Sequence, residues 1–258
     1  MCTLVLLRRP DHDWSLLLAA NRDEMIERPS APPGRHWEDR AEVVAGLDIT
    51  AGGSWLGLND HGLVAAVMNR EGTLGREWDK RSRGELVLEA LDHAEAGDAA
   101  GALADLHPAA YRPFNLVVAD AHNAYWLRHG GDGEIRVHPI APGLHMLSAT
   151  EMDDLNHPRI GAYMECFRQA PTPDPAQGRW TAWRTLLADR NYSEAAGPVA
   201  AMNLEPANGF GTVSSALVAL PSPALGEEPI WLHADGPPDR VPFLPVACRD
   251  HGVEIPAS

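Results

Sequence analysis

The start of the chain combines a thiol with a free terminal amine. Cys2 directly follows Met1, and cysteine is small enough for the initiator methionine to be removed. Removal would leave an α-amine and a thiol on one residue, and in model compounds these titrate at about 8 and about 8.5. The amine could then act as general base for its own side chain, as in N-terminal nucleophiles. The alternative is that Cys2 is only a small apolar residue at the start of an edge strand.

A β-hairpin is predicted to hold further polar residues beside this N-terminus. Apolar runs over residues 3–8 and 14–20 flank a polar turn at residues 10–13. The second run leads into Asn21, Arg22 and Asp23, which could lie next to Cys2. Arg22 would stabilise a thiolate, because a nearby cation lowers a cysteine pKa. In the alternative interpretation, Arg22 and Asp23 form a structural ion pair at a strand end.

Composition limits the possible functions. The chain has 258 residues, 45% hydrophobic and 22% charged, which predicts one globular domain over residues 1–258. The sequence contains no apolar run of the roughly 18 residues that a membrane span needs, and its N-terminus has no signal-peptide pattern. The net charge of -15 argues against binding to nucleic acid or anionic membranes. Three scattered cysteines indicate neither a disulfide framework nor a zinc site, so a cytoplasmic location is expected.

Several common chemistries are excluded by missing motifs. The sequence has no Walker-type phosphate loop, no dinucleotide-binding glycine pattern and no nucleophile elbow. The histidines do not form a zinc-binding pattern either, so neither a metal nor another cofactor is expected. A small-molecule substrate or ligand is the expected partner, and the sequence does not indicate an oligomeric state.

Alternation of strands and helices predicts the fold class. Apart from the hairpin, strands are expected at 43–45, 55–59, 63–68, 115–119, 124–127, 135–140, 144–149, 211–220 and 230–233. Helices are expected at 82–95, 98–106, 156–169 and 179–189, the first with a capping box of Ser82 and Glu85. The proline-rich segment 27–41 should be an ordered loop, and the C-terminal tail should be irregular. This order favours antiparallel α+β layers over a repeating βαβ series.

The distinctive strings in the sequence resemble the NRDE family, the transport and Golgi organisation type-two-like proteins. The matching residues are Cys2, Leu18 to Glu24, Arg28 to Ser30, Gly46 to Asp48, Gly53 to Gly57, Asn69-Arg70, Ser82 to Leu86 and Phe114 to Val117. The resemblance implies an N-terminal-nucleophile hydrolase-like fold, a four-layer αββα sandwich with two antiparallel sheets. It also implies that Asp23 hydrogen-bonds the amine or thiol region of Cys2. It does not imply a particular substrate.

The chain departs from this family at two positions. Relatives tend to carry an asparagine where Ala149 stands and an arginine where Val213 stands. Loss of one oxyanion donor typically costs about 100- to 1000-fold in rate. Asn69, at a predicted strand end, and Ser148 are the candidates to replace such a donor.

A glycine-rich turn is expected to contribute to binding. Gly53, Ser54 and Trp55 follow Gly52, and glycine permits a substrate or the N-terminus to approach the backbone closely. Trp37, Trp55 and Trp78 are candidate pocket walls or core residues. The predicted binding residues are thus Asn21, Gly53, Ser54, Trp55 and Ser148, and the predicted catalytic residues are Cys2, Arg22, Asp23 and Asn69.

Two functions fit the sequence. The first is a cysteine N-terminal-nucleophile hydrolase that cleaves a linear, non-peptide amide C–N bond. The second is a non-catalytic binding or carrier protein that holds a hydrophobic small molecule, such as a lipid-like acyl compound or haem, on the same scaffold. The fold does not choose between them. Cys2 and Asp23 favour the enzyme, whereas Ala149 and Val213 favour the carrier.

Overall fold

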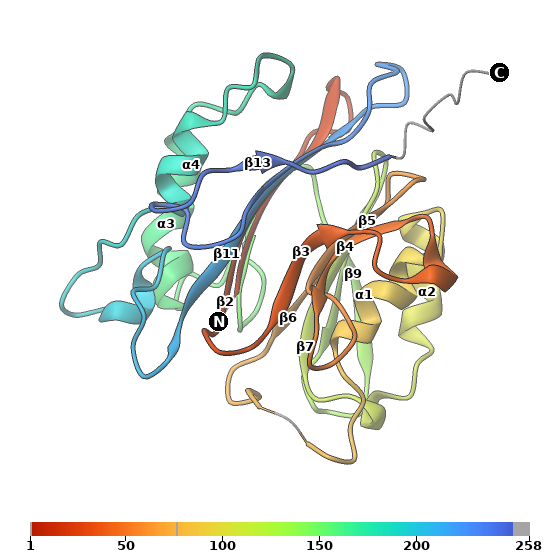
Figure 1. Ribbon diagram of the computed structural model, residues 1–258, viewed down its shortest axis with the longest axis horizontal. Helices are drawn as coiled ribbons and strands as arrows, with labels where there is room; N and C mark the ends of the chain where they lie inside the picture. The colour runs from red at the N-terminus through yellow and green to blue at the C-terminus, as the bar shows by residue number, and fades with distance from the viewer. Residues whose placement is uncertain (1, 76, 250–258) are drawn as a thin grey trace, which may run out of the picture.

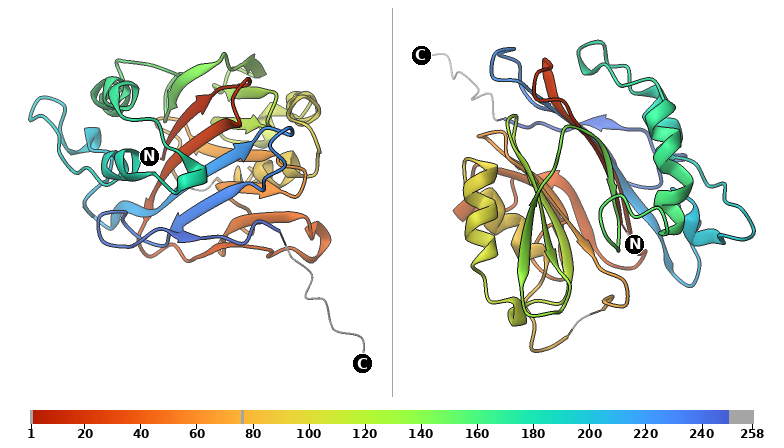
Figure 2. Two further views of the ribbon diagram at one scale, coloured as in Figure 1. Left: turned by 90° about the horizontal axis from the view of Figure 1, so that it is seen from above. Right: turned by 180° about the vertical axis from the view of Figure 1, so that it is seen from behind.

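Two antiparallel sheets pack face to face, and a helical layer covers the outer face of each (Figures 1 and 2). The computed structural model describes residues 2–75 and 77–249. An apolar core fills the space between the sheets, and two further cores join each sheet to its helices. This arrangement confirms the predicted four-layer αββα sandwich. The prediction of a single domain over residues 1–258 stays a prediction, and residues 250–258 lie outside the described part.

The first sheet contains the N-terminal hairpin at its centre. Its strands run in the order β10, β1, β2, β11, β12, β13. Their bounds are β1 Thr3–Arg8, β2 Trp14–Met25, β10 Gly143–Leu147, β11 Phe210–Pro221, β12 Ile230–Ala234 and β13 Leu244–Pro245. The predicted hairpin is confirmed, and β2 continues past residue 20, so that Asn21, Arg22 and Asp23 belong to the strand itself.

The second sheet is a meander of consecutive strands. Its order is β3 to β9, with β3 Ser30–Gly34, β4 Val43–Asp48, β5 Leu56–Asn59, β6 Val64–Asn69, β7 Phe114–Ala119, β8 Ala124–His129 and β9 Ile135–Pro139. The prediction of a loop over 27–41 was wrong in part, because this segment contains β3 and a 3-10 helix at Glu38–Arg40. Since β3 is an edge strand, Pro32 and Pro33 are tolerated there.

Within the described ranges, four α-helices form the outer layers. They are α1 Gly84–Leu91 and α2 Ala96–Ala104 on the second sheet, and α3 Pro158–Gln169 and α4 Thr181–Leu187 on the first. Short 3-10 helices cover Pro108–Ala110, Pro175–Gln177 and Pro198–Ala200. The predicted capping box forms in part: Ser82 N donates to Glu85 Oε1 at 3.2 Å, but Ser82 Oγ accepts from Gly84 N at 3.2 Å, and α1 begins one residue later than predicted, with Arg83 at the N-cap.

The alternation of side chains along β1 and β2 decides which residues face the core between the sheets. Leu4 of β1 belongs to that core, whereas its neighbour Val5 packs toward α3 and α4. Because successive side chains of a strand point to opposite faces, Arg22 points between the sheets while Asn21 and Asp23 point toward the helices. Of these three adjacent polar residues, one therefore faces the core between the sheets and two face the layer of α3 and α4.

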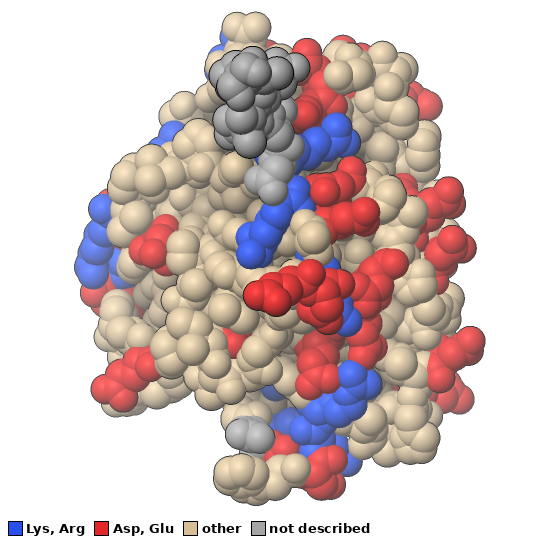
Figure 3. Space-filling model, turned by 45° about the vertical axis from the view of Figure 1, so that its right-hand side comes forward, with Lys and Arg blue, Asp and Glu red and all other residues tan. Residues whose placement is uncertain are grey.

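The surface carries acidic and basic groups side by side. On the face shown in Figure 3, carboxylates and basic side chains alternate along a central band. Across the described ranges, none of the helices combines the length and the apolar character that crossing a membrane would need.

Candidate functional site

A pocket opens between the two sheets at the end where the chain begins. About 350 Å³ of space, part of it open to solvent, lies between walls that come from β1, β2, β5, β6 and β11 together with the residue before β5. The lining residues are Cys2, Thr3, Leu4, Ala20, Asn21, Arg22, Trp55, Leu56, Ala66, Val67, Met68, Ser214, Ser215 and Ala216. Most of them are apolar, and Cys2 and Arg22 are the groups with obvious chemistry.

The backbone and thiol of Cys2 are both held by neighbouring groups. Ser148 Oγ donates to the carbonyl oxygen of Cys2 at 2.9 Å, and Asn115 Nδ2 donates to the carbonyl oxygen of Ser148 at 2.9 Å. The Cys2 Sγ lies 3.8 Å from the backbone oxygen of Asp23. Burial raises the pKa of the Cys2 thiol; the carboxylate of Asp23 adds to the increase, while the charge of Arg22 opposes it. In this form of the chain the thiol is therefore mainly protonated at neutral pH.

Arg22 is a buried cation in the wall of the pocket. Its side chain lies over Trp55, with the guanidinium carbon 4.1 Å from the ring centroid, and its Nη1 donates to Ser30 Oγ at 3.3 Å. Among the residues with described positions, no carboxylate lies within ion-pair distance of Arg22. Burial lowers the pKa of the guanidinium. Gly46 makes room for Trp55, because a Cβ at that position would lie 2.4 Å from the indole ring.

The carboxylate of Asp23 points away from the pocket, into a buried polar network beneath α3. Arg159 Nη1 donates to Asp23 Oδ2 at 2.8 Å and to Thr3 Oγ1 at 2.5 Å. Thr212 Oγ1 donates to Asp23 Oδ1 at 2.7 Å. The side chains of Asp23 and Arg159 are 0% and 2% exposed. Arg159 is not predictable from local sequence, because it lies 136 residues from Asp23 and carries no local motif.

Asn21 connects β2 to the segment that follows α4. Its Nδ2 donates to the carbonyl oxygens of Leu187 and Met202, each at 2.9 Å, and its Oδ1 accepts a hydrogen bond from Ser215 Oγ. Asn21 is 1% exposed. With its amide committed in this way, Asn21 positions the strand that carries Arg22 and Asp23.

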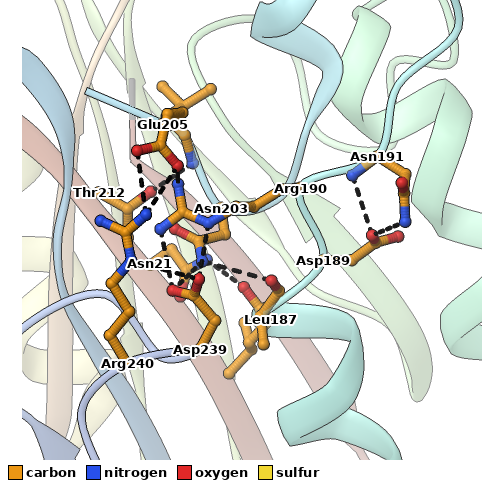
Figure 4. A network of polar contacts seen from close by, with 12 residues as sticks. Asn21, Leu187, Asp189, Arg190, Asn191, Asn203, Glu205, Thr212, Asp239 and Arg240 are labelled. Carbon is orange, nitrogen blue, oxygen red and sulfur yellow. Dashed lines mark hydrogen bonds and ion pairs between the residues drawn. The ribbon is translucent and has the colours of Figure 1, made fainter. Parts of the chain in front are cut away.

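A neighbouring network anchors the same segment to the C-terminal part of the chain (Figure 4). Asp239 accepts hydrogen bonds from Arg190 at 2.7 and 2.9 Å and from Asn203 Nδ2 at 2.7 Å. The hydrogen bonds from Arg190 lower the pKa of Asp239 to about 2. Glu205 pairs with Arg190 and with Arg240, so the network joins the segment after α4 to the segment that contains Asp239 and Arg240.

The residues of the predicted turn before β5 have different roles. Gly53 approaches another part of the backbone, because a Cβ there would lie 2.5 Å from the carbonyl carbon of Gly84 at the start of α1. Ser54 Oγ bonds locally to the backbone of Leu56. Trp55 lines the pocket, whereas Trp78 is 88% exposed.

The remaining predicted positions lie near the pocket but outside its wall. Asn69 ends β6, where alternation places it on the same face as Ala65 and Val67, toward α1 and α2. Ala149 is buried two residues after the end of β10. Val213 is the extra residue of a β-bulge between Thr212 and Ser214, opposite Asp23 and Arg22. The predicted contribution of Asn69 to catalysis stays a prediction.

Metal-binding groups do not gather in the described ranges. Residues 2–75 and 77–249 contain no cluster of three or more His, Cys, Asp or Glu side chains that could hold an ion.

Comparison with known sequences gives a match over the N-terminal three quarters of the chain. The family described as Transport and Golgi organisation 2 matches residues 1–191. The chain is 34% identical over 149 residues to the Transport and Golgi organization protein 2 homolog of Homo sapiens, and 32% identical over 148 residues to the Mus musculus homolog. Each alignment covers 52% of this chain and 50% of the relative, so the chain spans about half the length of the curated relatives it matches.

Comparison with solved structures identifies the fold. The N-acylethanolamine-hydrolyzing acid amidase ortholog of Caenorhabditis elegans has a TM-score of 0.53 at 14% identity, covering 84% of this chain and 92% of that one. A variant of conjugated bile acid hydrolase from Clostridium perfringens has a TM-score of 0.53 at 10% identity, covering 95% and 96%. Penicillin V acylase from Agrobacterium tumefaciens has a TM-score of 0.51 at 13% identity, covering 91% and 83%. At these identities the likeness shows the N-terminal-nucleophile hydrolase fold alone.

Proposed function

Because the chain belongs to the Transport and Golgi organisation 2 family and has the N-terminal-nucleophile hydrolase fold, we propose that it is an amidohydrolase with Cys2 as its nucleophile. The observation that carries the proposal is the position of Cys2 in the wall of a small, largely apolar pocket, with its backbone carbonyl held by Ser148 and Arg22 nearby. Its substrate would be a linear, non-peptide amide with an apolar acyl part, and its location the cytoplasm.

The mechanism requires a chain that begins at Cys2. The thiol of this structure has a raised pKa, chiefly because it is buried. An α-amine on Cys2 would supply a base within the same residue and take up the thiol proton. Arg22 then stabilises the thiolate, because its own charge has no carboxylate partner among the described residues. Asp23, fixed by Arg159 and Thr212, orients the strand end that faces the new N-terminus.

The reaction proceeds in two steps. The thiolate attacks the amide carbon, a C–S bond forms, and the C–N bond breaks as the leaving amine takes the proton from the α-ammonium of Cys2. Water then attacks the thioester with the α-amine as base, which releases a carboxylic acid and restores the thiol. Both steps pass through an oxyanion that needs hydrogen-bond donors. The Ser148 hydroxyl donates to the Cys2 carbonyl and so positions the nucleophile. Asn69 lies on the α1 and α2 face at the end of β6, so its predicted role as a donor requires its side chain to turn toward the pocket.

The test compares chains with different N-termini. A chain released by a protease so that it begins at Cys2 should hydrolyse N-acyl amides, and its Cys2 should alkylate with an apparent pKa below about 8.5. The same chain with an uncleaved N-terminal extension should be inactive, with a slowly alkylated Cys2.

Cys2→Ala should abolish turnover and leave the thermal unfolding unchanged. Cys166→Ala is the matched control, since Cys166 is exposed on α3, and this variant should keep full activity. Activity that survives Cys2→Ala would rule out Cys2 as the nucleophile.

A second function, a non-catalytic carrier of a hydrophobic small molecule, is favoured by the raised pKa of the Cys2 thiol. A neutral thiol is an ordinary apolar wall residue. In that case native mass spectrometry should detect a ligand bound in equal amounts by the original chain and by Cys2→Ala, and the chain that begins at Cys2 should show no turnover. A lipid-like acyl compound and haem are the two ligands to be tested.

A further inference from the structure

The wall that the first sheet gives to the pocket begins with a polar row of side chains across three strands. Cys2, one residue before β1, comes level with Arg22 of β2 when the ladder between these strands is extended by one residue. Arg22 is in turn opposite Ser214 of β11. Directly opposite residues project to the same face of a sheet, and all three residues line the pocket. The proposed nucleophile therefore stands at one end of a polar outer row.

The next row inward consists of apolar side chains, most of them small. Leu4 is opposite Ala20, and Ala20 is opposite Ala216. The second sheet contributes Ala66 of β6 to the same pocket. Three alanines, two from the first sheet and one from the second, thus line the apolar part of the pocket. Because their side chains are only methyl groups, they leave the room between the sheets that larger residues would fill.

Large side chains close the space beyond these alanines. Two residues farther along their strands are Leu18, Val218 and Val64, which belong to the core between the sheets and are at most 1% exposed. Leu18 and Val218 are directly opposite each other, so they form the next row of the first sheet. We call these three residues the floor. Rows on one face of a strand are about 7 Å apart, so the pocket continues for about one row past the level of the thiol before the floor stops it.

We propose that the three alanines form an acyl subsite that accepts a short, straight acyl group, and that the floor excludes longer ones. At about 7 Å per row, the subsite holds a chain of butanoyl to hexanoyl length when the amide carbon lies beside the thiol. The walls enclose about 350 Å³, part of it open to solvent, which agrees with a small group. The inference rests on the proposed function, because it places the acyl part of the substrate in this pocket. The same floor keeps haem and long lipid-like chains out of the interior.

Binding to a variant that cannot turn over tests the length limit. Isothermal titration of Cys2→Ala with N-methylacetamide, N-methylbutanamide, N-methylhexanamide and N-methyldecanamide compares ligands that differ only in their acyl chains. The affinity should rise about fourfold per methylene up to N-methylhexanamide, because each methylene is removed from water. It should then fall by about tenfold or more for N-methyldecanamide, because the longer chain would have to displace the packed floor.

Two variants should move the limit in opposite directions. Ala216→Val narrows the subsite and should reduce the preference for N-methylhexanamide over N-methylacetamide by about tenfold. Val218→Ala opens the floor and should raise the affinity for N-methyldecanamide by about tenfold, since it removes two methyl groups beyond the subsite. Val118→Ala is the matched control, because it removes the same groups from the core beneath α1 and α2. That variant should leave the chain-length profile unchanged.

Thermal unfolding shows whether each variant is folded. If Ala216→Val does not fold, Val218→Ala decides the question alone, because it removes atoms and does not overfill the core.

The outcomes separate the acyl subsite from the amidohydrolase proposal. Tightest binding of N-methyldecanamide, failure of all four amides to bind, or a profile that neither variant changes would overturn the subsite. If the profile is found while the chain that begins at Cys2 does not hydrolyse these amides, the subsite stands and the enzyme proposal fails. Hydrolysis of the hexanoyl and decanoyl amides with equal kcat/KM would support the enzyme and overturn the subsite.

Discussion

Replacing Arg159 by methionine tests whether the buried ion pair beneath α3 holds the N-terminal strands in place. Arg159 is 2% exposed and bonds both Asp23 Oδ2 at 2.8 Å and Thr3 Oγ1 at 2.5 Å. Methionine keeps much of the volume but removes the charge, so that Asp23, at 0% exposure, loses its buried cation. Removing one partner of a buried pair typically costs about 3–5 kcal/mol. For a chain of this length, that loss should lower the Tm by roughly 10 °C.

Chemical denaturation followed by tryptophan fluorescence gives the free energy of unfolding directly. Arg168→Met on the same helix is the matched control, because Arg168 is 50% exposed and lies 3.8 Å from Glu165. The free energy of unfolding of that variant should stay within about 0.5 kcal/mol of the value for the original protein. The double variant Asp23→Leu with Arg159→Met should lose less than the sum of the two single changes, since it leaves no unpaired charge. If Arg159→Met costs no more than Arg168→Met, the pair does not hold the strands and the reasoning is refuted.

Two further predictions concern the glycine contact and the acidic network. Gly53→Ala should lower the free energy of unfolding by about 1–3 kcal/mol in a urea titration, because its Cβ would meet the backbone of Gly84 at 2.5 Å. Gly101→Ala in α2 is the control: a Cβ there has nothing within 4 Å, so this variant should be more stable than the original protein. A neutral result for Gly53→Ala would show that the start of α1 can shift. Asp239 has a depressed pKa, so its pairing with Arg190 stabilises the protein above the unfolded value of about 3.9 and is lost as the pH falls through about 2. Asp239→Asn should therefore lower the Tm at pH 7 and flatten its fall below pH 4, and an unchanged acid limb would contradict this.

Local sequence patterns were sufficient to predict most of the strands and helices. The hairpin of β1 and β2, the strands of the second sheet after β3 and the capping box at Ser82 depend on alternation and on neighbouring residues, so the sequence reveals them. β3 was missed because its two prolines usually oppose a strand, and only its place at a sheet edge permits them. The four strands predicted between residues 115 and 149 divide between the two sheets, because β10 pairs with β1 instead of β9. That partner is a matter of tertiary structure, which alternation does not record.

The candidate site shows the same limit more sharply. The predicted hairpin placed Cys2, Arg22 and Asp23 close together, and the structure confirms the hairpin. Because side chains alternate along β2, however, Arg22 and Asp23 lie on opposite faces of the sheet. The partners that fix them, Arg159 and Ser148, come from segments more than 100 residues away. Such pairings follow from packing between layers, which a pattern of nearby residues does not reveal.

The pairing of β2 with β11 has a consequence for the order of folding. Ser215 and Ala20 are hydrogen-bonded across a separation of 195 residues, whereas the strands of the second sheet follow one another between residues 30 and 139. Closing so long a loop costs more entropy than forming a meander, so the second sheet can form while the ribosome is still adding residues and the first sheet cannot be completed. Until residues 210–221 emerge, the edge of β2 opposite β1 has no partner strand and stays open to association. The pocket around Cys2 is thus completed only after β11 has been synthesised, although its first wall is the first part of the chain to be made.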